Sequence, residues 1–385
     1  MSATVSESRS PLGKLLYAAR EPQPRTTDFK ILWILIIALN LFGLLMILSA
    51  SSVTALYQYG SSWYQFRLQA GWFVLACGAM FFTSRYSYEL LSKWMKWILV
   101  GSAALMVAVL IPGLGVSVNG SARWIGWGPL RMQPSELAKL AVILYAADTL
   151  TRRVGQIRDW KAVLRPVAIV FLGFAALLMM QPNLGTTIIL ATIVLVMLFV
   201  GGVPLKPLGW LTAMLVGAAT VFAFAEPYRF RRLMAFRDPW ADRLNTGFQT
   251  IQSQVGFANG GVLGTGLGQG RAKWGFLPEA HTDFIYAIIG EEIGLVGSVL
   301  VIGMFLGFAL VGVRTALHAR DRFGMLLATG ITTWILIQAF INIGACVGVL
   351  PITGVPLPFV SAGGSSLVFT MAAAGILLNV ARQER

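Results

Sequence analysis

The chain has 385 residues and a formal net charge of +14, and its composition is 56% hydrophobic and only 12% charged. This composition, with a mean hydropathy of +0.72, excludes an ordinary soluble domain and is typical of a polytopic membrane protein. The two cysteines, Cys77 and Cys346, lie inside apolar runs and predict neither a disulfide framework nor a metal cluster. The predicted fold class is therefore an all-α polytopic membrane protein.

Residues 1–30 are rich in Ser, Pro and Arg, and we interpret them as a disordered cytoplasmic arm. Residues 31–381 form the predicted transmembrane domain, and residues 382–385 form a cytoplasmic tail. A spanning helix needs about 20 predominantly apolar residues, and ten runs fit this requirement. The predicted spans are 31–51, 68–84, 95–113, 135–150, 164–181, 184–202, 207–225, 283–313, 324–347 and 361–381. The run 283–313 is longer than one span requires, which predicts a tilted, kinked or extended helix.

Basic residues are concentrated in alternate short loops between the predicted spans. The basic loops contain, among others, Arg85, Lys93, Lys96, Arg152, Arg153, Lys206, Arg314 and Arg320. The opposite short loops carry only Arg67, Arg123 and Arg131. The positive-inside rule therefore places both termini in the cytoplasm. The large 226–282 loop is then extracytoplasmic, which the rule permits because long loops translocate largely regardless of charge.

The 226–282 loop is the one long polar segment between predicted spans, and it is rich in cations. Its candidate substrate-binding residues are Arg229, Arg231, Arg232, Arg271 and Lys273. Cations with aromatic neighbours at a membrane surface suit phosphate-bearing lipid headgroups. The alternative is a solvated loop face that touches anionic lipid non-specifically. Nucleic acid is not an expected partner, because the basic residues are split across both sides of a membrane.

Ionisable residues inside predicted spans are costly and are therefore functional candidates. Glu136 and Lys139 open the fourth span, with the serine before Glu136 as a candidate helix cap. Because they are three residues apart, the two side chains share a helix face and can pair. The pair is either a neutralised ion pair near the interface or part of a polar pocket on the outer side. Asp148, which lies near Arg152, is interpreted as structural.

The eighth predicted span opens with His281, Thr282 and Asp283. Thr282 or Asp283 could cap a helix, since both residue types are favoured at that position. Glu291 and Glu292 follow within the same run, and at least one of them requires an internal partner. Three carboxylates along one span exceed what helix capping requires.

Two glycine-containing segments are predicted to be irregular. The run Gly260–Gly270 lacks the flanking strand and helix of a dinucleotide-binding motif and the Lys-Ser/Thr of a P-loop. We interpret it as a re-entrant or surface-hugging loop in which glycines permit close backbone approach. The segment from Phe340 to Ser366 contains three prolines together with glycines. Such backbone is tolerated at membrane depth only where it is buried or lines a cavity.

Five sequence blocks resemble the SEDS family of shape, elongation, division and sporulation proteins. The blocks are Asn119–Trp124, Gln133–Lys139, Gln181–Gly185, Leu277–Phe284 and Leu350–Ser366. The motif Pro-Glu-Ala-His-Thr-Asp-Phe, with Gly-Glu-Glu following, is highly specific. Gly-Leu-Gly-Gln-Gly and Gly-Gly-Ser-Ser are closer to the FtsW division branch than to the RodA branch. Ala362 departs from the tyrosine expected before the Gly-Gly pair.

The resemblance implies a peptidoglycan glycosyltransferase. Such an enzyme polymerises lipid II, an undecaprenyl-pyrophosphate-linked disaccharide peptide, at the outer face of the cytoplasmic (inner) membrane. The implied partners are a class B penicillin-binding protein transpeptidase and other division proteins, at the division septum. Asp283 matches the family's essential acid. Trp124, Glu136 and Lys139 match positions around the outer cavity, and His281 lies in the most specific block.

We expect Asp283 to act as the general base that deprotonates an acceptor sugar hydroxyl. Because a lipid pyrophosphate is already a good leaving group, the second acid that glycosidases need is dispensable. The departing pyrophosphate still needs positive charge, from the loop cations or from a divalent ion such as Mg²⁺ or Mn²⁺. The sequence identifies no obligate cofactor and no metal ligands. A single displacement predicts inversion at the anomeric carbon.

Two other functions are compatible with these features. A transporter, such as a flippase for the same lipid, also uses broken helices and intramembrane charges. A non-catalytic scaffold of a division complex would tolerate changes at Asp283. The concentration of polar residues on one face disfavours the transporter, because a midplane pathway needs charges deep in several helices.

Overall fold

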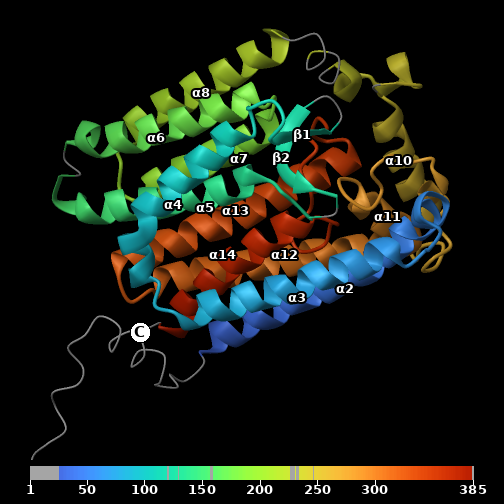
Figure 1. Ribbon diagram of the computed structural model, residues 1–385, viewed down its shortest axis with the longest axis horizontal. Helices are drawn as coiled ribbons and strands as arrows, with labels where there is room; N and C mark the ends of the chain where they lie inside the picture. Colours follow the sequence, from blue (N-terminus) through green and yellow to red (C-terminus); the bar gives the residue numbers. More distant parts are fainter. Residues whose placement is uncertain are drawn as a thin grey trace, which may run out of the picture.

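The computed structural model describes residues 26–118, 121–128, 130–156, 159–225, 230, 234–245 and 247–383 (Figure 1). Most of the described chain is helical. The helices that make up the bundle are α2 (Thr27–Tyr59), α3 (Tyr64–Arg85), α4 (Glu89–Ala108), α5 (Pro134–Arg152), α6 (Trp160–Met180), α7 (Leu184–Val200), α8 (Leu205–Ala225), α10 (Phe248–Gly260), α11 (Ile285–Glu292), α12 (Gly294–Leu317), α13 (Arg322–Val347) and α14 (Gly364–Arg382).

Eight of the described helices are long and apolar enough to cross a membrane. These are α2, α3, α4, α6, α8, α12, α13 and α14. Each of the ten predicted runs contains a helix. Two of these helices, α5 and α7, are not among the eight, because one carries too many charges and the other is too short. The helix α7 has only 17 residues, whereas α5 carries Glu136, Lys139, Asp148 and Arg152. The chain is therefore a multi-span membrane protein.

The bundle has a buried centre and an apolar outside. The most buried long helices, α13 and α14, pack against each other, and α13 also contacts α5, α7 and α12. The outer helices expose large apolar side chains, including Phe82 on α3, Trp97 on α4 and Leu172 on α6. Hydrocarbon chains of lipid are a suitable solvent for such a surface, since every helix satisfies its backbone internally.

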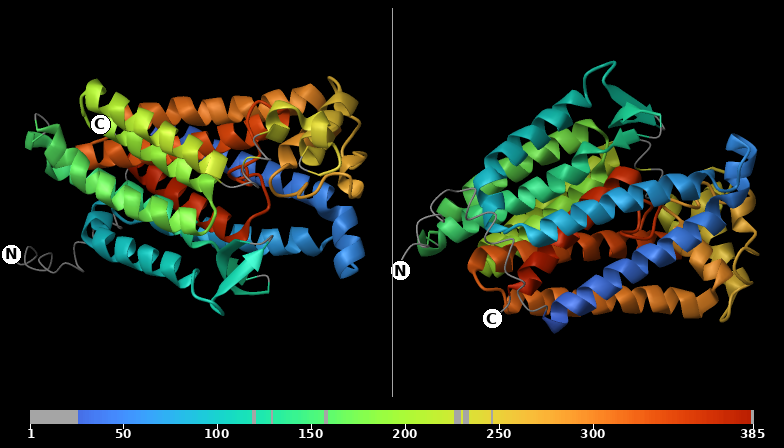
Figure 2. Two further views of the ribbon diagram at one scale, coloured as in Figure 1. Left: turned by 90° about the horizontal axis from the view of Figure 1, so that it is seen from above. Right: turned by 60° about the horizontal axis from the view of Figure 1, so that its bottom comes forward.

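The two ends of the bundle are formed by different segments of the chain. At one end, which we call the terminal end, Thr26 caps α2 and its hydroxyl donates to the carbonyl of Ala381 at the end of α14, at 2.7 Å. The opposite end, which we call the loop end, holds residues 234–245 and 247–283 with α10 (Figure 2). The loops predicted to be cytoplasmic meet at the terminal end, where Tyr88 bonds to Asp321 and Asn379 bonds to the carbonyl of Tyr86.

Most helix ends differ by a few residues from the predicted spans, and three differences change the predicted organisation of the chain. Residues 27–30, predicted as part of the arm, belong to α2, and residues 1–25 lie outside the described chain. At the other terminus, α14 extends to Arg382, and residues 384–385 lie outside the described chain. The predicted span 283–313 is divided into α11 and α12, which confirms the kinked alternative. The break occurs at Ile293 and at Gly294, whose φ of +75° suits glycine.

The all-α prediction missed a small sheet between α4 and α5. It contains β1 (Gly115–Val118), β2 (Ser121–Trp127) and β3 (Leu130–Met132), antiparallel in the order β1-β2-β3. Its register pairs Gly115 with Ile125 and Ile125 with Met132. Strands of three to seven residues give too little alternation to be recognised between long apolar runs. The sheet matters because it carries two side chains of the site described below.

Candidate functional site

The backbone before α11 is held residue by residue by α13 and by the segment that connects α13 to α14. The carbonyl of His281 accepts from the Ala362 amide at 2.9 Å, and the carbonyl of Thr282 accepts from the Ser361 hydroxyl at 2.6 Å. The next carbonyl, that of Asp283, accepts from Asn342 Nδ2 at 2.7 Å. We call these three hydrogen bonds the carbonyl clamp. It fixes the backbone that carries Asp283.

Neither of the predicted capping residues serves as a helix cap here. The N-cap of α11 is Phe284, without a side-chain cap hydrogen bond. Thr282 instead donates from Oγ1 to Glu279 Oε2 at 2.8 Å, closing a turn in which Glu279 has a positive φ of 56°. Helix capping therefore does not account for Thr282. Similarly, Gln133 and not the serine after Pro134 is the N-cap of α5.

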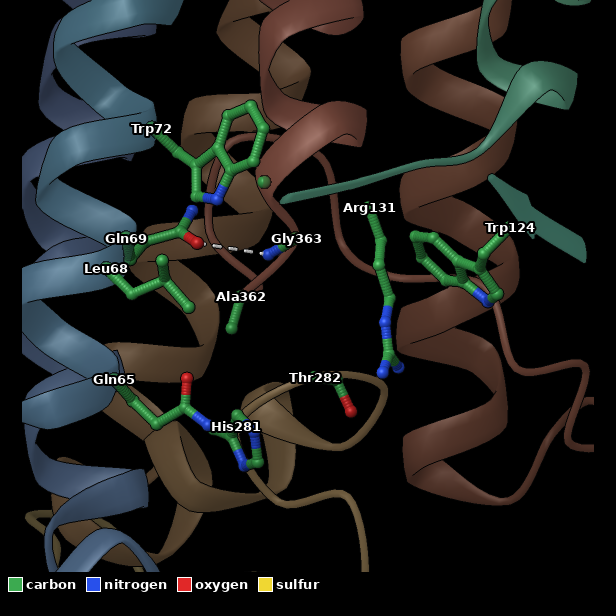
Figure 3. A pocket seen from close by; sticks show the side chains of 11 residues that line it. Gln65, Leu68, Gln69, Trp72, Trp124, Arg131, His281, Thr282, Ala362 and Gly363 are labelled. Carbon is green, nitrogen blue, oxygen red and sulfur yellow. Dashed lines mark hydrogen bonds between the residues drawn. The ribbon is translucent and has the colours of Figure 1, made fainter. Parts of the chain in front are cut away.

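A cavity of about 250 Å³ lies directly beside the clamp at the loop end (Figure 3). Its walls come from α3, from the small sheet, from the turn before α11 and from the start of α14. The lining residues are Gln65, Leu68, Gln69, Trp72, Trp124, Arg131, His281, Thr282, Ala362, Gly363 and Gly364. Two indoles, two amides and one guanidinium thus surround the cavity, and Asp283 directly follows the lining residue Thr282 without lining the cavity itself. A concave site with a few convergent polar groups is the usual form of a small-molecule site.

The start of α14 is shaped by close contacts to α3. Gln69, which is buried, accepts from the Gly363 amide at 3.2 Å through Oε1. A Cβ on Gly364 would lie only 2.4 Å from atoms of the Trp72 indole. Glycine is therefore required where this ring packs on the backbone. Residues 340–347 of the segment predicted to be irregular belong to α13, whereas its last part, before α14, lines a cavity, as expected for non-helical backbone at membrane depth.

Of the predicted site residues, Trp124 and His281 line this cavity together. Arg131, on β3, is a lining cation that sequence reasoning did not select. In Figure 3 its guanidinium extends toward Thr282. The signal was present, because Arg131 is one of the few basic residues in the predicted outer short loops. Burial lowers the pKa of His281 below its usual 6.5, and the charge of Glu279 opposes this shift only partly.

Glu136 and Lys139 form the predicted ion pair, and the structure places it in the interior of the bundle. Lys139 Nζ lies 2.9 Å from Glu136 Oε1, and both side chains are almost fully buried. The ammonium also donates to Gln338 Oε1 at 2.8 Å and lies 4.6 Å from the Trp334 ring centroid. Gln338 in turn donates to the carbonyl of Pro356 at 3.0 Å. The pair is therefore connected by hydrogen bonds to the segment that carries the clamp.

The glycine-rich run wraps around the break between α11 and α12. The amides of Thr265 and Gly266 donate to the carbonyls of Glu291 and Glu292, at 2.9 and 3.0 Å. Leu295 donates to Gly261 in the opposite direction, at 2.9 Å. These bonds replace the helical bonds that the break removes. The run is thus a close-packed loop, and the predicted close backbone approach is confirmed.

Glu291 and Glu292 both find internal partners in this loop. The Glu291 carboxylate accepts from the backbone amides of Arg271 and Ala272, at 2.9 and 3.1 Å. Glu292 pairs with Lys273, whose Nζ lies 3.0 Å from Oε1. Lys273 was predicted to bind substrate, and this assignment is corrected. Its side chain is 4% exposed, and its ammonium is committed to neutralising Glu292.

The remaining predicted loop cations have a different status. Arg229, Arg231 and Arg232 lie outside the described residues. Arg271 donates its backbone amide to Glu291 and has an exposed side chain, and its role in substrate binding stays a prediction. Within the described chain, no group of three or more His, Cys, Asp and Glu side chains is arranged to hold a metal ion. The involvement of Mg²⁺ or Mn²⁺ also stays a prediction.

The fold and the site define a multi-span membrane protein with a polar cavity at the loop end of its bundle. The family model described as "Cell cycle protein", for FtsW, RodA and SpoVE, matches residues 29–385. The chain belongs to this family. It is 40% identical to a probable peptidoglycan glycosyltransferase FtsW of Geobacter metallireducens, over 91% of this chain and 93% of the relative. It is 39% identical to stage V sporulation protein E of Bacillus subtilis, over 94% and 99%.

Solved structures have the same fold. A chain from a peptidoglycan synthase complex that coordinates polymerization and crosslinking superposes with a TM-score of 0.75 at 30% identity, covering 91% of this chain and 96% of that chain. The rod shape determining protein RodA of Thermus thermophilus superposes with a TM-score of 0.67 at 27% identity, covering 92% and 96%.

Proposed function

We propose that this chain is a peptidoglycan glycosyltransferase that polymerises lipid II at the outer face of the cytoplasmic membrane. The observation that carries the proposal is the placement of Asp283. Its backbone carbonyl is held by the clamp, and it directly follows Thr282, which lines the polar cavity, in a chain with relatives named as probable peptidoglycan glycosyltransferases. The positive-inside pattern supports an outward-facing loop end, because the basic short loops meet at the terminal end.

In the proposed reaction Asp283 is the general base. Its carboxylate accepts the proton of the acceptor sugar hydroxyl while the hydroxyl oxygen attacks the anomeric carbon of the donor lipid. The bond between that carbon and the pyrophosphate oxygen breaks, and its electron pair leaves with the pyrophosphate. Proton transfer of this kind contributes roughly 10²- to 10⁴-fold to a rate. The single displacement inverts the anomeric configuration.

The negative charge of the departing pyrophosphate requires a cation close to the cavity. Arg131 is suited to this role, because its guanidinium lines the cavity and offers paired donors that fit phosphate oxygens. Arg271 and the loop arginines Arg229, Arg231 and Arg232 are further candidates. A divalent cation would supply the same charge stabilisation.

The partner class and the location complete the proposal. A solved relative belongs to a synthase complex that joins polymerization to crosslinking. We therefore assign to this chain a crosslinking partner of the class B penicillin-binding protein type, together with other division proteins. The proposed location is the division septum, because the glycine motifs of the sequence resemble the FtsW division branch.

The test uses the full-length protein reconstituted with its partner and lipid II. Wild-type protein is expected to form glycan polymer, and Asp283→Asn is expected to lose at least about 100-fold in rate. Asp159→Asn is the matched control, because Asp159 is an exposed residue that precedes α6 at the terminal end. Near-normal polymer from a folded Asp283→Asn variant rejects the general-base role. Lipid movement without polymer from the wild-type protein rejects the transferase and favours transport.

A further inference from the structure

One face of α13 carries a row of buried residues that the proposed chemistry does not use. Trp334, Gln338, Asn342 and Cys346 are spaced at four-residue intervals and therefore lie on one side of the helix. All four are at most 2% exposed. Buried side-chain amides are costly inside a membrane bundle unless both donors and acceptors are paired. Their partners consequently indicate why such residues are present.

Asn342 joins two segments that are distant in sequence. Its Nδ2 donates to the carbonyl of Asp283 at 2.7 Å and to the carbonyl of Val355 at 2.8 Å. Both amide protons of this side chain are thus used to bridge the turn before α11 to the segment before α14. The thiol of Cys346 contacts the same Asp283 carbonyl at 3.4 Å, one helical turn further along α13.

Ser361 makes the adjacent bridge. Its hydroxyl donates to the carbonyl of Thr282 at 2.6 Å and accepts from the amide of Leu357 at 2.8 Å. The segment therefore folds back on itself and holds Thr282 at the same time. Nearby, Gly354 has a φ of +71°, and a Cβ on it would lie 3.5 Å from Asp283 Oδ2. The segment 351–362 thus bonds to the backbone of the 281–283 turn, and Gly354 leaves only the space of one methyl group beside the Asp283 carboxylate.

We propose that Asn342 and Ser361 are positioning residues for Asp283 in the glycosyl transfer, an inference that rests on the proposed function. They touch no reacting atom. By fixing two consecutive carbonyls, they hold the Cα of Asp283 and so determine where its carboxylate meets the acceptor hydroxyl. A misplacement of about 1 Å at a reacting group costs on the order of 100-fold in rate. The clamp therefore contributes mainly to the rate of the chemical step.

The chain offers a matched control for Asn342. Asn379 on α14 is equally buried, and its Nδ2 also bridges two carbonyls, those of Thr83 and Tyr86, at 3.2 and 2.7 Å. This bridge lies at the terminal end. Asn342→Asp and Asn379→Asp therefore remove the same donors from the same kind of site with almost no change of volume. Only Asn342 is connected to Asp283.

The experiment compares these two variants in the reconstituted complex with lipid II. Asn342→Asp is expected to lower kcat about 10- to 100-fold with KM changed by less than about 3-fold, whereas Asn379→Asp keeps kcat within about 2-fold of wild type. Both are expected to lower the thermal midpoint. A kcat for folded Asn342→Asp within about 2-fold of wild type, or an equal loss of kcat in Asn379→Asp, overturns the proposal.

Ser361→Ala provides a second, milder variant in case Asn342→Asp fails to fold. It removes one hydroxyl, and a kcat loss of about 5- to 10-fold is expected. Ser102→Ala is its control, because Ser102 is a buried serine on α4 whose hydroxyl donates to the carbonyl of Leu99 in its own helix. A Ser361→Ala enzyme as active as its control overturns the role of Ser361.

Hydrogen–deuterium exchange separates this inference from the proposed function. In Asn342→Asp, amides of peptides covering 281–288 are expected to exchange at least about 10-fold faster, with no such change in Asn379→Asp. This readout does not require activity. If the wild-type protein forms no polymer but the exchange shift is present, the proposed function fails and the clamp stands. If exchange is unchanged, the clamp itself is refuted.

Discussion

Lys273 and Glu292 form a buried ion pair in which Nζ lies 3.0 Å from Oε1 and the side chains are 4% and 0% exposed. Glu292 also accepts from the Ser49 hydroxyl at 2.6 and 2.7 Å and from the Gly268 amide at 3.0 Å. The pair thus joins α2, the glycine-rich loop and the end of α11. Buried charges persist only when they are paired and hydrogen-bonded. This pair anchors the glycine-rich loop to the break between α11 and α12.

Removal of one partner of this pair is expected to destabilise the protein strongly. Lys273→Met leaves the Glu292 carboxylate buried without its cation, at a cost of about 3–5 kcal/mol. Glu292→Gln leaves the ammonium unpaired, at a similar cost. The double variant Lys273→Met/Glu292→Gln is expected to lose less than the sum of the single losses. Thermal unfolding of the four proteins in detergent, as a double-mutant cycle, measures this coupling.

The matched control is the pair of Asp148 and Arg152 near the terminal end. Their N–O distance is 2.7 Å, but the arginine side chain is 68% exposed. Arg152→Met is therefore expected to cost at most about 1 kcal/mol. Equal losses for Lys273→Met and Arg152→Met would contradict the interpretation that burial determines the strength of the first pair.

The ion pairs of the described chain differ in how far the sequence can predict them. Glu136 with Lys139 and Asp148 with Arg152 were predictable, because helix geometry brings residues three or four apart together. The partner of Glu292 was not, because the contact crosses a loop and a helix break for which no local rule exists. Lys273 was consequently assigned to the substrate instead of to the interior.

The same limit applies to the candidate site. The residues of the motif around Asp283 were recognised, but the side chains that hold them come from distant positions. Asn342 is 59 positions from Asp283, and Ser361 is 79 positions from Thr282. Tertiary contacts of this range leave no periodic pattern in one sequence. The sheet that carries Trp124 and Arg131 was missed because its strands are too short to show alternation.

Arg131 provides a second prediction. If its guanidinium binds the pyrophosphate of the donor, Arg131→Gln removes charge-assisted hydrogen bonds worth about 1.5–3 kcal/mol. Productive lipid II binding is then expected to weaken by about 10- to 100-fold, seen as a higher KM for polymer formation. Arg131→Lys keeps the charge but not the paired donors, and it is expected to recover part of this loss.

The control for this prediction is Arg67→Gln. Arg67 is exposed on α3 near the same end but does not line the cavity of Figure 3. A change in general surface charge would affect both variants, and more so at low ionic strength. An unchanged KM in Arg131→Gln, or an equal rise in Arg67→Gln, rules out a specific phosphate contact at Arg131.

A third prediction concerns pH. Burial lowers the pKa of His281 in the folded protein below the usual 6.5, while nearby Glu279 partly opposes the shift. At a pH between the pKa of His281 in the folded chain and the usual value of 6.5, the unfolded chain binds more protons than the folded chain. The contribution of His281 to the free energy of unfolding is therefore fully present above about pH 6.5, and it is lost as the pH falls toward the pKa of the folded chain. Thermal midpoints measured from pH 7.5 down to pH 5 test this slope.

His281→Gln is expected to flatten this pH dependence, since glutamine does not titrate. The other histidine, His318, is exposed at the end of α12 and gives the control His318→Gln. If the midpoint of His281→Gln falls as steeply with acid as that of wild type, another group is responsible for the slope. Asp283 and Glu279 are the adjacent acids to examine by substitution in that case.

The glycine-rich loop supplies the last prediction. Gly264 has a φ of +81°, and a Cβ on it would lie 2.2 Å from the carbonyl oxygen of Glu292. Gly264→Ala therefore combines left-handed backbone strain of about 1–2 kcal/mol with overpacking of about 1–3 kcal/mol. Gly60→Ala separates the two costs, because Gly60 has a φ of +72° with nothing within 4 Å of its Cβ position. The thermal midpoint of Gly264→Ala is expected to lie well below that of Gly60→Ala. The rate of polymer formation by Gly264→Ala is also expected to fall, because the loop is displaced from the α11–α12 break. Equal midpoints for the two variants would show that the loop yields to the added methyl group, and that its close contact with Glu292 is dispensable.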